Sequence, residues 1–279
     1  MDHLKHLLAL AGTIDSHCHL TVTAGRGVPL RDILRRCFDA GMCSLLDIGI
    51  HAGDLQQRLE AAAGFPYVVH SVGVHPAEAA RVTADTALRS IRDAVANPAV
   101  VAIGETGLDW FRGRDHSAAQ YALFEAQLHA AREFDLPLII HNRNATEDIL
   151  RVLRDCPPPR GGIMHCFSAA PDYVDKCVDL GFYVSFAGNL TFPDAEQLRL
   201  AAARVPLDAL LVETDAPFLA PLPARGRPNH PGYVAHTYGA LAEIRHQPLD
   251  RLVCAVAENF ARLFPTAPLA PRTNAEQQR

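Results

Sequence analysis

The sequence predicts an α/β fold, a (β/α)8 barrel, on three observations. Eight short runs rich in Val, Ile and Leu recur along the 279 residues, as is typical of buried strands. Amphipathic segments with apolar residues three and four apart separate these runs, as in parallel βαβ units. Eight such units in about 260 residues fit a single TIM barrel. The alternative is an open doubly wound sheet, which normally has a Gly-rich turn where this chain has DSHCH.

The expected elements alternate along the chain. The strands are expected at Gly12–His17, Cys43–Gly49, Tyr67–Val74, Val100–Gly104, Leu138–His141, Gly162–His165, Phe182–Phe186 and Leu210–Glu213. The clearest helical stripes are Leu30, Ile33, Leu34, Cys37 and Phe38, then Leu123, Phe124, Leu128 and Ala131. Later helices are expected at Asp194–Ala203, Pro231–Arg245 and Leu249–Leu263. These elements predict one barrel domain over residues 1–264 and a flexible, Pro-rich tail over residues 265–279.

Composition and charge exclude several classes of protein. With 49% hydrophobic and 20% charged residues, the chain has an ordinary globular composition, not that of a disordered or fibrous protein. The net charge of −5 lacks the basic surplus of a protein that neutralises many phosphates along nucleic acid. Any phosphate must therefore be met by a few Arg residues or by bound metal ions.

The same features favour a cytoplasmic location. Seven scattered cysteines without a CxxC motif suit a reducing compartment. The apolar run LKHLLALAG near the start is too short and too weakly charged for a signal peptide. No stretch approaches the 18 or more apolar residues of a membrane span, so we expect no membrane partner.

Histidines and carboxylates follow six of the eight expected strands. His17 and His19 are two residues apart at the end of the first strand, where alternation puts both on one face. The later strands end at residues of the same kinds: His75, Glu105, His141, His165 and Asp215. In a barrel the carboxyl ends of the strands surround the active site, so these groups converge. A lone His is more often structural than a ligand, but the convergence predicts a site for Zn²⁺, Mn²⁺ or a similar ion.

The motifs around these residues resemble the TatD family of metal-dependent hydrolases. They are DSHCHL (15–20), GVHP (73–76), GETGLDW (104–110), HCFS (165–168), SFAGNLTF (185–192), ETDAPFLAP (213–221), RGRPNHPGYV (225–234) and ENFARLF (258–264). The resemblance runs from about Ile14 to Phe264. Two positions depart from the family pattern: Asn144 replaces an acidic residue, and Ala169 replaces the Gly after HCFS.

The resemblance implies two divalent metal ions, Mg²⁺, Mn²⁺ or Zn²⁺. By this resemblance His17 and His19 bind one ion, and His141 and His165 bind the other. Glu105 is the expected bridge, and Asp215 completes the first site beside the reactive water. The family resemblance further implies hydrolysis of phosphodiester bonds in DNA from the 3′ end. Physical chemistry supports these roles, since paired cations polarise a phosphoryl oxygen and a nearby carboxylate can accept a proton.

Three residues are candidates for binding substrate: His75, Arg225 and Asn229. Arg225 and Asn229 belong to a loop after the last strand, where barrel loops commonly meet phosphate. The alternatives are a surface ion pair for Arg225 and a structural hydrogen bond for His75. Trp110 and Phe111 either stack on a base or pack internally.

Cys18 and Cys166 are expected to face the barrel wall as inert thiols.

The expected substrate is a DNA end or a short single-stranded nucleic acid, with no obligate protein partner. One alternative keeps the metal site but cleaves a carboxylic ester or amide, such as a lactone or an aminoacyl-tRNA ester. A second alternative is a non-catalytic metal-binding scaffold, although every expected ligand and the expected base, Asp215, are present.

Overall fold

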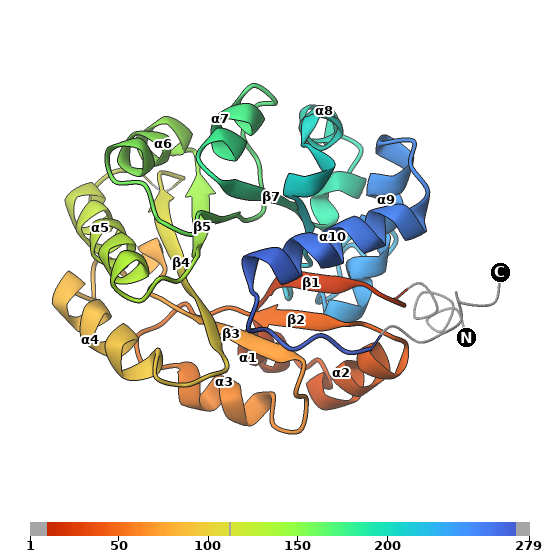
Figure 1. The fold of residues 1–279 in the computed structure, drawn as a ribbon, viewed down its shortest axis with the longest axis horizontal. Coiled ribbons are helices and arrows are strands. Elements are labelled where there is room, and N and C mark those ends of the chain that lie inside the picture. Colours follow the sequence, from red (N-terminus) through yellow and green to blue (C-terminus); the bar gives the residue numbers. More distant parts are fainter. Residues whose placement is uncertain (1–9, 112, 272–279) are drawn as a thin grey trace.

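The eight predicted strands form one parallel sheet whose strand order follows the sequence from β1 to β8. The computed structural model describes residues 10–111 and 113–271. The strands are β1 (Ile14–Cys18), β2 (Ser44–Asp47), β3 (Val68–Val72), β4 (Val100–Asp109), β5 (Leu138–Arg143), β6 (Gly162–Met164), β7 (Phe182–Phe186) and β8 (Leu210–Val212). The fold is therefore the predicted barrel, and Figure 1 shows helices around the outside of the strands.

Ten α-helices lie in the described part of the chain. They are α1 (Leu20–Gly25), α2 (Leu30–Asp39), α3 (Leu55–Ala61), α4 (Ala84–Ala94), α5 (Ser117–Glu133), α6 (Thr146–Asp155), α7 (Tyr173–Asp179), α8 (Glu196–Arg204), α9 (Val234–Ile244) and α10 (Leu249–Leu263). Short 3₁₀ helices include η3 (Pro76–Glu78), η4 (Gly188–Thr191), η5 (Leu207–Ala209) and η6 (Pro231–Tyr233). Helix α2 buries one apolar stripe, formed by Leu30, Leu34 and Cys37.

The first and last strands meet at the end of the barrel that carries the polar residues. A parallel bridge joins Cys18 to Ala216, just beyond β8. The backbone N–H of Asp215 donates to the carbonyl of His17 at 2.9 Å, and that of His19 donates to the carbonyl of Ala216 at 2.8 Å. These bonds bring the end of β1 beside the segment after β8.

Strand β4 is longer than predicted and extends to Asp109 instead of ending at Gly104. Its extension pairs with β5 in the register Gly107↔His141 and Asp109↔Arg143. Gly107 has φ +137°, and a Cβ on it would lie 2.1 Å from the carbonyl oxygen of His141. Glycine therefore permits the close approach that puts Asp109 and His141 on neighbouring strands.

The beginning of the predicted tail contacts the barrel. The backbone N–H of Ala270 donates to the carbonyl of Cys43 at 2.9 Å, and Ala267 packs against the core. The rest of the tail, from residue 272, lies outside the described residues, as do residues 1–9. In the part of the chain that the structure describes, no helix is long and apolar enough to cross a membrane.

A buried ion-pair cluster lies between β2 and α3. The guanidinium of Arg58, 1% exposed, donates to Oδ2 of Asp47 at 3.0 Å and to Oδ1 of Asp54 at 2.9 Å. It also donates to the carbonyl of Ser71 at 2.7 Å, while Nδ1 of His70 lies 3.0 Å from Oδ2 of Asp47. Each buried charge thus has a close partner of opposite sign, which such groups require.

Candidate metal centre

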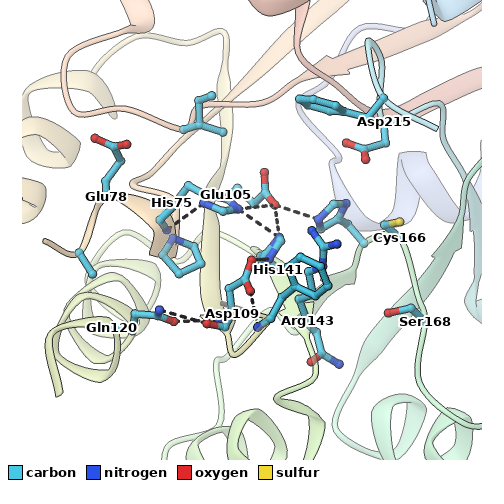
Figure 2. Close-up of a pocket in the computed structure, with 18 of the residues that line it drawn as sticks. His75, Glu78, Glu105, Asp109, Gln120, His141, Arg143, Cys166, Ser168 and Asp215 are labelled. Atoms are coloured by element: carbon cyan, nitrogen blue, oxygen red, sulfur yellow. Dashed lines mark hydrogen bonds and ion pairs between the residues drawn. The ribbon is translucent and has the colours of Figure 1, made fainter. Parts of the chain in front are cut away.

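The polar residues at the strand ends open into a pocket of about 870 Å³. Its walls come from the segments that follow most of the strands, including His19, His75, Glu105, His141 and Asp215. Figure 2 shows Glu105 near the centre of this group, with His75 to its left, His141 below it and Asp215 farther off at the upper right. The structure therefore places the predicted convergence at the carboxyl ends of the barrel strands.

One group of ligand atoms gathers around Oε2 of Glu105. Nε2 of His17 and Nε2 of His19 lie 3.2 Å apart, and each lies 3.6 Å from this oxygen. Oδ1 of Asp215 lies 3.7 Å from the first nitrogen and 3.5 Å from the second. Ligands held at about 2.0–2.2 Å in a tetrahedral shell lie about 3.3–3.6 Å from one another. Two nitrogens and two carboxylate oxygens at these separations fit a divalent ion.

A second group gathers around the other oxygen of the same carboxylate. Nδ1 of His141 lies 2.8 Å from Oε1 of Glu105, and Nε2 of His165 lies 2.9 Å from it. The ring of His165 stacks on that of His17, with the centroids 3.8 Å apart, so the two groups are in contact. The carboxylate of Glu105 thus presents one oxygen to each group, as a bridging ligand does.

The electrostatics of this cluster favour a cation. Burial raises the pKa of Glu105, but His165, His75 and His141 outweigh it and hold the pKa well below its ordinary value. Burial lowers the pKa of His165, yet the carboxylates of Glu105 and Glu213 raise it well above the ordinary value. The buried carboxylates therefore draw positive charge into the site, either as protons on the imidazoles or as metal ions.

Two carboxylates that the sequence analysis did not assign lie on the outer nitrogens of the second group. Oδ2 of Asp109 lies 3.1 Å from Nε2 of His141, and Oε1 of Glu213 lies 3.3 Å from Nδ1 of His165. The same Glu213 oxygen accepts a hydrogen bond from the backbone N–H of Cys166 at 2.9 Å. Metal-binding histidines commonly have such a carboxylate on the nitrogen that faces away from the ion. Asp109 and Glu213 therefore orient the imidazoles.

His75 presents a proton to the cluster, because its other nitrogen is already occupied. Its Nδ1 accepts a hydrogen bond from the backbone N–H of Ala77 at 3.0 Å. Burial lowers the pKa of His75 to about 4, so near pH 7 the ring is neutral and its one proton lies on Nε2. That Nε2 lies 3.2 Å from Nδ1 of His141 and 3.6 Å from Oε1 of Glu105. His75 is thus a donor at the edge of the cluster.

Asp15 fixes the strand ends that carry His17 and Asp215. Its Oδ1 accepts hydrogen bonds from the backbone N–H of Thr214 at 2.9 Å and of His17 at 3.3 Å. Its Oδ2 accepts the Thr214 hydroxyl at 2.6 Å. One fully buried side chain therefore ties β1 to the segment after β8.

The family model described as TatD related DNase matches residues 14–265. The chain belongs to the TatD family. This TatD chain is 37% identical over 264 residues to the uncharacterized metal-dependent hydrolase YcfH of Escherichia coli K12, covering 90% of this chain and 95% of the relative. It is 33% identical over 251 residues to the uncharacterized metal-dependent hydrolase YabD of Bacillus subtilis, covering 90% and 98%.

A solved structure supports the same assignment. The crystal structure of YjjV, a TatD homologue from Escherichia coli K12, superimposes with a TM-score of 0.84 at 30% identity. The match covers 92% of this chain and 99% of that one. The protein is therefore a TatD-family metal-dependent hydrolase with a TIM-barrel fold, and its His/carboxylate cluster is suited to metal.

The structure brings most of the predicted site residues of this TatD chain together. The cluster contains His17, His19, His75, Glu105, His141, His165 and Asp215. Two predicted substrate-binding residues lie elsewhere. Arg225 is exposed and its guanidinium lies over the ring of Phe192, 4.4 Å from the centroid. Neither Arg225 nor Asn229 is among the described residues that line the pocket.

Asn229 is fully buried and its side-chain amide is used within the loop. Nδ2 donates to the carbonyls of Thr214 at 2.8 Å and Phe218 at 2.7 Å. Oδ1 accepts from the backbone N–H of His230 at 2.9 Å. These contacts give Asn229 a structural role in fastening the loop after β8, whereas direct contact with substrate stays a prediction.

Of the aromatic and thiol residues near the site, some line the pocket and others pack internally. Trp110 packs internally, with Nε1 donating to Oδ2 of Asp148 at 2.9 Å, whereas Phe111 is 57% exposed and lines the pocket. Cys18 is buried against the carbonyl of Leu46, as expected. The expectation that Cys166 faces the barrel wall is wrong, because this residue lines the pocket, as Figure 2 shows. Its φ of +44° departs from strand geometry, so the alternation argument does not apply to it.

Proposed function

We propose that this TatD-family hydrolase cleaves phosphodiester bonds of DNA as a 3′–5′ exodeoxyribonuclease that uses two divalent ions. The observation that carries the proposal is the position of Glu105, whose two carboxylate oxygens face separate groups of ligand atoms. Two cations suit a phosphodiester, because they can stabilise both the attacking and the leaving oxygen of an in-line displacement.

The proposed ligand sets follow these two groups. His17, His19 and Asp215 would hold one ion, His141 and His165 would hold the other, and Glu105 would bridge them. Mg²⁺, Mn²⁺ and Zn²⁺ are all compatible with mixed imidazole and carboxylate ligands. When bound, such a pair of ions polarises a phosphoryl oxygen and makes water acidic enough to lose a proton near neutral pH.

Asp215 is the proposed general base. Burial raises its pKa, but the hydrogen bond to His19 and the charges of His165 and His17 outweigh burial and keep the pKa below its ordinary value. The carboxylate is therefore ionised near pH 7, and its side chain keeps an exposed fraction of 13% toward the pocket. It can accept a proton from a water molecule there.

His75 is the proposed substrate contact. Its Nε2 carries the proton and its Nδ1 is fixed by Ala77, so the N–H points steadily at the cluster. A donor in this position can hydrogen-bond a phosphoryl oxygen or the leaving oxygen. Five carboxylates line the pocket and the net charge of the chain is −5, so an anionic substrate would require cations bound in the cluster.

The test is digestion of a 5′-labelled single-stranded oligonucleotide with Mg²⁺ or Mn²⁺. A ladder that shortens from the 3′ end, and that disappears for Glu105→Ala, is the expected result. Glu78→Gln is a matched control, because Glu78 lines the same pocket but lies outside the ligand groups. An intact oligonucleotide with wild-type protein that holds its metal would overturn the nuclease proposal.

One observation favours a second candidate, hydrolysis of an aminoacyl ester at the same centre. The side of the pocket near η3 and the start of α5 contributes Glu78 and Asp115, which suit a cationic amino group better than a phosphate. Release of amino acid from an aminoacyl-tRNA ester, with the oligonucleotide left intact, would favour this candidate. A protein that binds metal but hydrolyses neither substrate would fit the scaffold alternative.

A further inference from the structure

Arg143 lies at the mouth of the pocket, two residues beyond His141 at the end of β5. Its guanidinium carbon lies 3.8 Å from the centre of the Phe111 ring, which is a close cation–π contact. Phe111 follows β4, so the pair joins the ends of two neighbouring strands. Figure 2 shows Arg143 beside Asp109, on the wall that also carries His141.

The charge of Arg143 is unusual in its surroundings. Five carboxylates line the pocket: Glu78, Glu105, Asp109, Asp115 and Asp215. Among the described lining residues, Arg143 is the one Arg or Lys. A fixed positive charge at the rim of such a pocket is expected to select the part of an anionic substrate that reaches it.

The N–H groups of the Arg143 guanidinium are available to bind a ligand. In the described ranges 10–111 and 113–271, no carboxylate or carbonyl lies within hydrogen-bond or ion-pair distance of its side chain. Arg114 offers a contrast, since it lies over the Trp110 ring and also pairs with Asp148 at 3.0 Å. An arginine that stacks on a ring through its face keeps the N–H groups at its edge available for a planar anion.

We propose that Arg143, held in place by Phe111, binds a second phosphate of the substrate, adjacent to the phosphodiester that is cleaved. This inference rests on the proposed function. The cleaved group must reach the ions that Glu105 would bridge, and Glu105 is only 2% exposed, whereas Arg143 is exposed at the rim. The part of the substrate that reaches Arg143 is therefore separated from the cleaved phosphodiester by a sugar. In a nucleic acid that part is the neighbouring phosphate, and the guanidinium fork matches its oxygens.

The experiment compares three dinucleotide substrates that differ by one phosphate: dTpdT, the same with a 5′-phosphate, and the same with a 3′-phosphate. The enzymes are the metal-loaded wild type, Arg143→Gln, Arg143→Lys, Phe111→Leu and the control Arg114→Gln. We expect one terminal phosphate to raise kcat/KM of the wild type by about 10-fold or more, as a charge-assisted hydrogen bond does. Arg143→Gln is expected to lose this gain, mainly through KM, and to cleave dTpdT within about 2-fold of the wild type.

The other variants show whether the gain depends on the charge of Arg143 or on the geometry of its guanidinium. Arg143→Lys keeps the charge but loses the planar fork, so part of the gain is expected to remain. Phe111→Leu is expected to reduce the gain because the guanidinium is no longer held by the ring. Arg114→Gln removes one positive charge outside the pocket lining and is expected to behave as the wild type. Circular dichroism and melting curves check that each variant is folded.

The experiment distinguishes failure of the Arg143 assignment from failure of the nuclease proposal. If the wild type cleaves all three substrates but gains nothing from either terminal phosphate, the assignment of Arg143 is wrong and the nuclease proposal stands. The same holds if Arg143→Gln keeps the gain or lowers activity on all three substrates equally. If the metal-loaded wild type cleaves none of them, the proposed function fails and the inference fails with it.

Discussion

Oδ2 of Asp109 and Nε2 of His141 lie 3.1 Å apart across the paired ends of β4 and β5. The contact holds the imidazole so that its Nδ1 faces Glu105 at 2.8 Å. One nitrogen of the ring is therefore fixed by a carboxylate at the pocket wall, and the other is aimed at the position proposed for a metal ion.

Asp109→Asn is expected to weaken the binding of one of the two ions. The amide keeps the size of the side chain but removes the charge that holds His141 and increases its basicity, so the affinity should fall about 10- to 100-fold. Titration of metal-free protein with Mn²⁺ or Zn²⁺ against a competing chelator measures the change. Glu78→Gln is the control within the same pocket. Equal affinities for Asp109→Asn and the wild type at both sites would contradict the assigned role.

Glu105→Gln is expected to lose metal and activity together. The neutral amide offers one oxygen where the carboxylate offers two, so it cannot serve both groups of imidazoles. Bound ions stabilise the transition state by several kcal/mol, so their loss should lower kcat about 1,000-fold or more. Elemental analysis of the purified variant should find fewer bound ions per chain than in the wild type. A variant with a full complement of metal and normal turnover would exclude the bridging role.

Removal of metal is expected to lower the melting temperature. Ions that bind the folded state alone stabilise it by about 2.7 kcal/mol at 100 times the dissociation constant. For a chain of this size that amount corresponds to a shift of about 5–10 °C. Scanning calorimetry with and without a chelator measures the shift, and added Mn²⁺ or Zn²⁺ should reverse it. An unchanged melting temperature, with release of metal verified, would show that the bound ions do not stabilise the folded state through this cluster.

Arg58→Met is expected to destabilise the fold by about 3–5 kcal/mol, because it leaves the buried carboxylate of Asp47 without its closest cation. Urea unfolding of metal-free protein measures the free energy. Arg92→Met is the matched control, since Arg92 pairs with Glu133 on the surface, and its unfolding free energy should stay close to that of the wild type. Similar effects for the two variants would argue against a buried network.

The acid stability of the protein is expected to depend on Asp47. Burial raises its pKa, but the charge of Arg58 and the hydrogen bond from His70 outweigh burial, so the folded-state pKa lies below the ordinary value of 3.8. A lowered pKa adds stability above pH 3.8, and this stability is lost as the pH falls through the folded-state value. Urea unfolding of metal-free protein between pH 5 and 3 should therefore show a shallower decline for Asp47→Asn than for the wild type, and parallel declines would contradict the assignment.

The barrel and the central cluster were predictable because their signals are local. Apolar runs mark strands, and a polar residue directly after such a run lies at the end of the barrel. The end of β4 was missed because GETGLD lacks an apolar pattern, and its pairing with β5 depends on the neighbouring strand.

The orienting carboxylates were harder to predict. Asp109 and Glu213 lie at strand ends in the sequence, yet their partners depend on how the rings of His141 and His165 rotate. Nothing in the local pattern specifies that rotation. The internal role of the Asn229 amide likewise depends on a loop fold that brings Thr214 and Phe218 within reach.

The bond between Asp15 and Thr214 joins residues 199 positions apart. The histidines of β1 emerge early from the ribosome, whereas the segment that carries Asp215 is made only after seven further strands. A nascent chain that stops before this point has His17 and His19 but neither the carboxylate beside them nor the last wall of the barrel. The His/carboxylate cluster is therefore complete only when synthesis has passed β8, and a chain that ends earlier lacks part of the site.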